Sequence, residues 1–397
     1  MLLRIARVYY FRADMKNLIA LVEEYLPRVE ALGDKRRLSR FLFETGYAHV
    51  FAARQDVGTP LLERALALGE EIGDEESIGY ASMGLMWHHV FWAPAGPERR
   101  ATIERLGRRA LAIGRQIKDV WLTSKTLLCL FDDAIFWGRV GEAERFGRQL
   151  LQLSEETGDP RPKGMGLFAL AFLTASGREF DTALEYAESA IRSSVSPVDR
   201  LFGRAAKATT LALRGDAQES LALLDEVRRQ TEAGEFRIVG LFATETPYGL
   251  ALLSAGSFGE GVRWIETAAK RYAAWGQPFA HYYGHGVLGQ IYLTMALGGQ
   301  RPPLAVMLRN LGFLARTAPF AARLARRHLE AAVQECRRLD ILFGLANALF
   351  HLGLLHQAKR RTREARVCLD EARAVAATAE AAALCEQIDA ARSSLEA

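Results

Sequence analysis

Two histidines four residues apart, His281 and His285, come nearest to metal-ligand spacing in this sequence. On a helix they share one face, where a pair of imidazoles can bind a transition metal. No HExxH frame and no third ligand accompany them, and Tyr282 and Tyr283 lie alongside. We therefore favour simple packing, with the wall of a binding groove as the next interpretation, and we predict no metal or other cofactor.

Two adjacent carboxylates, Asp132 and Asp133, interrupt an apolar run, LLCLFDDAIFWGR (127–139). Both cannot reach solvent if that helix is enclosed, and a buried carboxylate needs a partner or a raised pKa. Arg139, or a residue of a neighbouring repeat, can supply the pairing. We favour a structural ion pair; the alternative is an acid that contacts a ligand, beside the ring of Trp137.

Aromatic residues gather in GLMWHHVFWAPAGP (84–97), where Trp87, His88 and Trp92 are candidates for recognition. Their helical spacing favours core packing. The alternative is an aromatic wall for a peptide or a small ligand, because large rigid rings give contact area at low entropic cost.

Pro247 interrupts a helical run between Glu245 and Tyr248. A proline inside a helix removes one backbone hydrogen bond, so a kink is expected. We favour a kink that sets the curvature of the chain, with a polar site facing a groove as the alternative.

Catalytic motifs do not emerge from the sequence. The nearest glycine clusters to a phosphate-binding loop, GHGVLG (284–289) and GDPRPKGMG (158–166), do not fit G-x-x-x-x-G-K-[ST]. Serines and histidines are scattered, with no G-x-S-x-G elbow. An independent enzyme is therefore the weakest interpretation.

The elements that must position these residues are helical hairpins that recur about every forty residues. Apolar residues recur at intervals of three and four, and alternating β-branched runs are nearly absent. The predicted fold is an all-α, right-handed solenoid of about nine hairpins with a C-terminal cap. Each hairpin is expected to begin at an aspartate, which can cap a helix N-terminus. These are Asp34, Asp74, Asp119, Asp159 and Asp199.

The best-preserved repeat spans 341–377. Its leucines fill the seam between two helices, and its small residues let the helices approach closely. Such a unit cannot bury its apolar face alone and must stack on neighbours. The residues expected to pack this hairpin are Leu349, Leu352, Gly353, Ala365, Leu369 and Ala372.

The chain divides into a solenoid over 1–300 and a continuation over 301–397, which follows an inserted helix near the glycine–proline run at 298–303. The first hairpin is either an ordinary one with a short helix or the remainder of a truncated repeat. The breaks predict pairs at 1–32, 36–72, 75–117, 119–157, 160–194, 197–233, 236–275 and 278–316, then helices at 319–338, 341–358, 361–377 and 379–395.

The composition is that of an ordinary globular protein, with 25% charged and 50% hydrophobic residues and a net charge of +4. Charges of both signs mix along the helices, so a nucleic-acid partner is not expected, and the basic run at 359–366 is interpreted as a solvated helix end. Four cysteines without ligand spacing and no apolar run of about 20 residues predict a cytoplasmic chain with no membrane partner.

Three segments resemble the C-terminal tetratricopeptide region of large bacterial signalling ATPases, including those fused to class III adenylate/guanylate cyclase domains. They are LLERALALGEEIGD (61–74), FDTALEYAESAI (180–191) and residues 328–372. A similar helical solenoid occurs in transcription activators of the maltose-regulon type. The resemblance implies a regulatory module whose catalytic domains lie outside this chain.

We therefore expect a non-catalytic interaction module in signal transduction, with a protein partner or effector on its concave face. One alternative is a small-molecule sensor with an aromatic and acidic pocket. The other is the regulatory part of a cyclase or ATPase. An enclosed pocket with few polar groups favours a small ligand, whereas a wide open groove favours a peptide.

Overall fold

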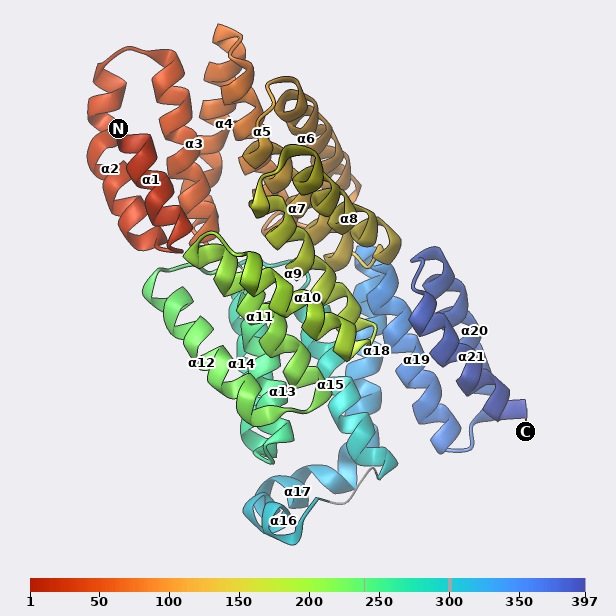
Figure 1. Cartoon of the computed structure of the whole chain (residues 1–397). Coiled ribbons are helices and arrows are strands. Elements are labelled where there is room, and N and C mark those ends of the chain that lie inside the picture. Colours follow the sequence, from red (N-terminus) through yellow and green to blue (C-terminus); the bar gives the residue numbers. More distant parts are fainter. Residues whose placement is uncertain (239, 299–301, 397) are drawn as a thin grey trace.

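The computed structural model describes residues 1–238, 240–298 and 302–396, and every regular element in these ranges is a helix. Consecutive helices pack as hairpins, and the hairpins stack into a curved array (Figure 1). The predicted all-α solenoid is therefore confirmed. The elements are α1 (Leu2–Phe11), α2 (Met15–Ala31), α3 (Lys35–Phe51), α4 (Gln55–Ile72), α5 (Glu75–Phe91), α6 (Pro97–Gln116), α7 (Val120–Phe136), α8 (Val140–Thr157), α9 (Pro160–Ser176), α10 (Phe180–Ser193), α11 (Pro197–Arg214), α12 (Ala217–Ala233), the π-helical turn η1 (Leu241–Glu245), α13 (Thr246–Ser254), α14 (Phe258–Ala274), α15 (Ala280–Leu297), α16 (Leu304–Arg309), α17 (Leu311–Thr317), the 3-10 turn η2 (Ala318–Phe320), α18 (Ala321–Leu339), α19 (Leu342–Ala358), α20 (Thr362–Thr378) and α21 (Ala382–Glu396).

Five aspartates were predicted to cap the first helix of a hairpin, and four of them do so. The carboxylates of these four accept hydrogen bonds from backbone amides two or three residues further on, which satisfies N–H groups left free by the first turn. The fifth prediction is wrong, because Asp199 lies within the first turn of α11 and the Ser196 hydroxyl caps that helix. The four capping residues are Asp34, Asp74, Asp119 and Asp159.

In most hairpins the first helix is buried almost all round, whereas the second buries one face. The hairpin of α19 and α20 shows how the two fit. A Cβ added at Gly353 would lie 2.8 Å from a methyl group of Leu369, so only glycine lets the helices come this close. Ala365, Leu369 and Ala372 are fully buried in the same seam. Leu349, Leu352 and Gly353 of the same repeat are buried as well.

The partner of α15 is α18, not the segment directly after α15. The sequence predicted one pair over 278–316, and part of its inserted break (299–301) lies outside the described residues. The helices α16 and α17 are six and seven residues long and contain no buried residue, so neither can cover α15. In contrast, α18 carries an apolar stripe that includes Ala325, Leu329 and Ala332. The short helices form an arm that projects from one end of the molecule (Figure 1).

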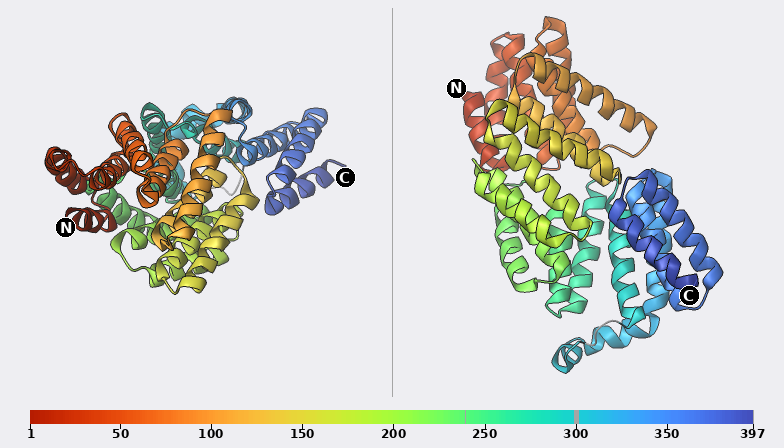
Figure 2. Two further views of the ribbon diagram at one scale, coloured as in Figure 1. Left: turned by 90° about the horizontal axis from the view of Figure 1, so that it is seen from above. Right: turned by 45° about the vertical axis from the view of Figure 1, so that its right-hand side comes forward.

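The solenoid winds far enough for later hairpins to touch earlier ones (Figures 1 and 2). At the first junction, the loop between α12 and η1 meets the ends of α2 and α3. The Arg237 amide donates to the Phe51 carbonyl at 2.9 Å, and Arg54 pairs with Glu235 at 2.7 Å, 181 residues away. The chain therefore returns to itself after about five hairpins.

The second junction joins the loop between α7 and α8 to α15 and α19. The Leu342 amide donates to the Trp137 carbonyl at 3.3 Å, and the Tyr282 hydroxyl donates to the Phe136 carbonyl at 2.9 Å. Gly138 permits this approach, because a Cβ there would lie 2.7 Å from the Phe343 Cβ. The two junctions connect early hairpins to late ones across the inner face of the superhelix.

Candidate functional site

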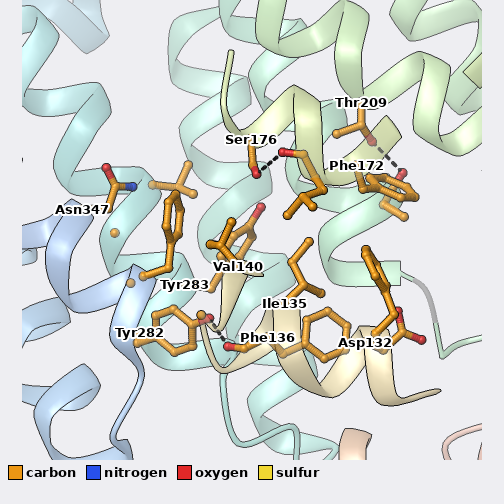
Figure 3. Close-up of a pocket in the computed structure, with 18 of the residues that line it drawn as sticks. Asp132, Ile135, Phe136, Val140, Phe172, Ser176, Thr209, Tyr282, Tyr283 and Asn347 are labelled. Carbon is orange, nitrogen blue, oxygen red and sulfur yellow. Dashed lines mark hydrogen bonds between the residues drawn. The ribbon is translucent and has the colours of Figure 1, made fainter. Parts of the chain in front are cut away.

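A cavity of about 250 Å³ lies inside the superhelix. Its walls come from α5, α7, α9 and α11 on one side and from α15, α18 and α19 on the other (Figure 3). Most of these helices are the first helix of their hairpin, so the first helices line the inner face. A cavity of about 150 Å³ accommodates benzene, so this one has room for a ligand of roughly ten non-hydrogen atoms.

Phenylalanines from successive hairpins form much of the wall. Phe91 and Phe136 are the last residues of α5 and α7, with ring centroids 5.1 Å apart, and Phe131 and Phe172 are the twelfth and thirteenth residues of α7 and α9. Phe168 stacks on Phe202 across α9 and α11, with ring centroids 4.8 Å apart. Successive hairpins thus each contribute phenylalanine rings to the same cavity, and the lining is predominantly aromatic and aliphatic.

Several polar groups of the lining are already committed to backbone carbonyls. The Ser176 hydroxyl donates to the Leu173 carbonyl at 2.6 Å, and the Tyr282 hydroxyl donates to the Phe136 carbonyl (Figure 3). The Thr209 hydroxyl lies 3.4 Å from the Ala243 carbonyl. These groups hold the wall together and offer a ligand little.

Asp132 is the one charged side chain among the described residues that line the cavity. It projects from α7, whereas the amide of Asn347 comes from α19 (Figure 3). Within the described ranges its carboxylate makes no hydrogen bond or ion pair. Burial raises the pKa of Asp132 to about 8, against a lowering by the Lys125 ammonium and a further increase from Asp133. The site therefore holds one uncompensated acid in an apolar surrounding.

Asp133, its neighbour, forms the ion pair that the sequence favoured. Its oxygens accept from Arg99 at 2.9 Å and from Arg139, and Arg99 also donates to the His89 carbonyl. The Arg99 guanidinium lies 4.2 Å from the centroid of the Trp137 ring. Asp133 and Trp137 are thus part of the packing between α5, α6 and α7.

Trp87 separates the cavity from a buried ammonium. Its ring lines the cavity and stacks on Phe91, at 5.4 Å and 5° between planes. The Lys125 ammonium lies 4.4 Å from the Trp87 ring and 5.6 Å from the rings of Tyr10 and Phe51. Since Lys125 does not line the cavity, these aromatic faces hold its charge on the side of α1 and α3.

The histidines take positions that sequence spacing did not reveal. His281 is exposed, whereas His285 points to His328 of α18 with their Nδ1 atoms 2.9 Å apart. The two histidines of the His281–His285 spacing therefore do not contact each other through this pair, and His285 packs against a second helix. Burial lowers the pKa of His328 to about 4, so both rings are neutral at pH 7 and one can donate to the other.

The remaining candidates lie away from the cavity. The Trp92 indole donates to the Val50 carbonyl at 3.1 Å, and His88 Nδ1 contacts the Thr59 hydroxyl at 3.0 Å. Glu245 pairs with Arg271 at 3.0 Å. Each of these side chains connects neighbouring helices.

Tyr248 likewise packs between helices, against Trp264 with ring centroids 4.5 Å apart. The kink expected at Pro247 takes the form of η1, and Pro247 itself lies in the first turn of α13, where a missing N–H is tolerated.

Of the residues predicted from sequence, the cavity brings together Trp87, Asp132 and Tyr283. The prediction did not include Asn347, Gly286 or the phenylalanines Phe131, Phe168, Phe172 and Phe202. Their signal in the sequence is phenylalanine on the first helix of successive hairpins, α5, α7, α9 and α11, which alone does not distinguish a cavity wall from core packing.

No cluster of three metal-ligating side chains occurs in the part of the chain that the structure describes. None of the described helices has the length and apolar character needed to span a bilayer. No protein-family model matches the chain, and no curated protein sequence matches it. The function must therefore be argued from the site itself.

Proposed function

We propose that this chain is a regulatory, non-catalytic solenoid that binds a small, mainly apolar effector inside its superhelix. The observation that carries the proposal is the aromatic cavity of about 250 Å³, with few polar groups and one acid. A cavity of this character is the usual setting for a small ligand. An extended peptide would need an open groove along the inner face, and the two junctions favour the small effector instead.

The cavity lies at the second junction, which gives the effector a way to act. Phe136 and Gly138 line it from the earlier hairpins, and Tyr282 and Phe343 line it from the later ones. A ligand in contact with both sides stabilises the closed superhelix relative to an open one, in proportion to its differential affinity. Occupancy of the cavity thus becomes a change in the pitch of the solenoid.

A protein partner, or a domain outside this chain, responds to the change in the pitch of the solenoid. The resemblance of 61–74, 180–191 and 328–372 to the regulatory region of signalling ATPases and cyclases supports this part of the proposal. In this account the chain senses and the partner acts.

Calorimetric titration with 4-phenylbutanol tests the proposal. With about eleven non-hydrogen atoms, this probe should bind with a Kd on the order of 0.1–1 mM and a negative heat-capacity change. Gly286→Leu should abolish binding, because Gly286 lines the cavity and a Cβ there meets no atom within 4 Å, so the leucine extends into free space.

Gly312→Leu is the matched control, since Gly312 is an exposed glycine of α17, away from the cavity lining. This variant should bind the probe as the wild type does. Equal binding to all three proteins, or no binding to any, would count against the proposed function.

A further inference from the structure

The charge of the cavity specifies the ligand more closely than its volume does. Asp132 is its one charged lining residue among those described, and no protein cation reaches it as an ion-pair partner. Carboxylates inside proteins are paired or hydrogen-bonded as a rule, because an isolated buried charge is unfavourable. The chain supplies no such partner, so the acid stays mostly protonated below about pH 8 unless a cation pairs with it.

The charged and titratable groups around Asp132 either have other partners or carry no positive charge. On its own helix, Asp133 is paired with Arg99 and Arg139, the Cys129 thiol is buried, and the Lys125 ammonium is held against Trp87. On the facing helix α15, the titratable lining groups are phenols, Tyr282 and Tyr283. Asp199 of α11 interacts with Lys125 rather than with the cavity. None of these groups neutralises the Asp132 carboxylate by contact.

Aromatic faces around Asp132 also favour a cationic ligand. Trp87, Phe91, Phe131 and Phe172 all line the same cavity as Asp132. The negative face of an aromatic ring attracts a cation, and the attraction grows when water is excluded. The neighbouring cluster around Lys125 already uses three rings to hold an ammonium in this protein.

We infer that the effector is a hydrophobic amine, whose ammonium pairs with the Asp132 carboxylate while its apolar part occupies the aromatic cavity. The inference rests on the proposed function, because it assigns a ligand class to the same cavity. An effector with a carboxylate is disfavoured, since its charge would face Asp132 with no cation in the lining. A neutral ligand would leave the carboxylate without a partner.

Binding should depend on pH in a defined direction. Burial holds the pKa of Asp132 at about 8, so the carboxyl is mostly protonated at pH 6 and half ionised near pH 8. An alkylammonium remains charged over this range and needs the ionised carboxylate. Its affinity should therefore rise about tenfold or more from pH 6 to pH 8, with a proton released on binding. A neutral alcohol should show no comparable change.

Titrations of the full chain with 4-phenylbutylamine, 4-phenylbutanol and 4-phenylbutyrate at pH 6 and pH 8 test the inference. We expect the amine to bind at least tenfold more tightly than the alcohol at pH 8, and the butyrate to bind most weakly. Asp132→Asn should remove the preference for the amine and its pH dependence while it keeps the affinity for the alcohol. Asp181→Asn, at a carboxylate that is 96% exposed, should leave all three affinities unchanged.

The outcomes separate the two claims. Equal affinity for amine and alcohol, or tightest binding of the butyrate, overturns the assignment of an amine and leaves the cavity as the effector site. If neither the alcohol nor the amine binds to wild-type protein, the proposed function fails as well. A preference for the amine that persists in Asp132→Asn also overturns the inference, since the charge then acts elsewhere.

Discussion

Replacing Gly138 with alanine adds one methyl group at the second junction and tests whether the superhelix is closed there. Its φ of +72° is in the left-handed region, and its Cα faces the start of α19. In Gly138→Ala the new Cβ would lie 2.7 Å from the Phe343 Cβ and 2.9 Å from its Cα. Carbon atoms normally pack at about 3.5–4.0 Å, so α19 must move away by about 1 Å.

The expected loss of stabilising free energy follows from the contacts at this junction. The displacement weakens the hydrogen bond from the Leu342 amide to Trp137 and the one from the Tyr282 hydroxyl to Phe136, each worth about 1 kcal/mol. The left-handed conformation adds about 1 kcal/mol for alanine, locally at Gly138. The variant should still fold, because Ala13 and Ala53 adopt positive φ at comparable turns.

Hydrogen–deuterium exchange at the Leu342 amide measures how much the junction itself is weakened, apart from the local backbone penalty at Gly138. A weakening of about 2 kcal/mol should raise its exchange rate about thirtyfold, since each 1.4 kcal/mol is a factor of ten. Gly158→Ala is the control: Gly158 has φ of +71°, and a Cβ there meets no atom within 4 Å. The Gly158→Ala variant should have the same local conformational penalty, and the Leu342 amide should stay protected from exchange. Equal exchange at Leu342 in the two variants would refute the closed junction.

Three further perturbations test other parts of the account. Gly286→Leu should raise the melting temperature as well as block the cavity, because it replaces an interior helical glycine with a better helix former and fills free space. Burial lowers the pKa of His328 to about 4, so between about pH 4 and 6.5 this residue binds fewer protons in the folded chain than in the unfolded chain. Its contribution to stability should therefore fall as the pH falls through this window, and His328→Gln should raise the melting temperature at pH 5 relative to that at pH 7. Arg99→Ala should destabilise the protein by about 3 kcal/mol in urea unfolding, because Asp133 loses a buried partner, whereas Arg100→Ala at an exposed neighbour should change stability by less than about 0.5 kcal/mol.

The hairpin repeat could be predicted from the sequence because its signals are local. Aspartate caps, the three- and four-residue spacing of apolar residues and the close approach at Gly353 all act within a few turns of helix. The pairing of α15 was harder to predict, since the arm of α16 and α17 separates it from its partner α18.

The cavity could be predicted only in part because it depends on contacts between hairpins far apart in sequence. Trp87 and Asp132 attracted attention by their residue types, and both line it. Gly138 follows the end of α7, a local position that favours glycine, but its second role requires Phe343, about two hundred residues later. The contact of His285 with His328 could not be predicted for the same reason, because His328 lies on another helix.

The central claim, that a small effector binds between two turns of the superhelix, is tested most directly by crystallography with a brominated probe. Crystals of the full chain with 4-(4-bromophenyl)butan-1-ol should show a bromine anomalous peak within the cavity, among residues of α7, α9, α15 and α19. Bromine peaks confined to the outer surface, with no peak in the cavity, would contradict it.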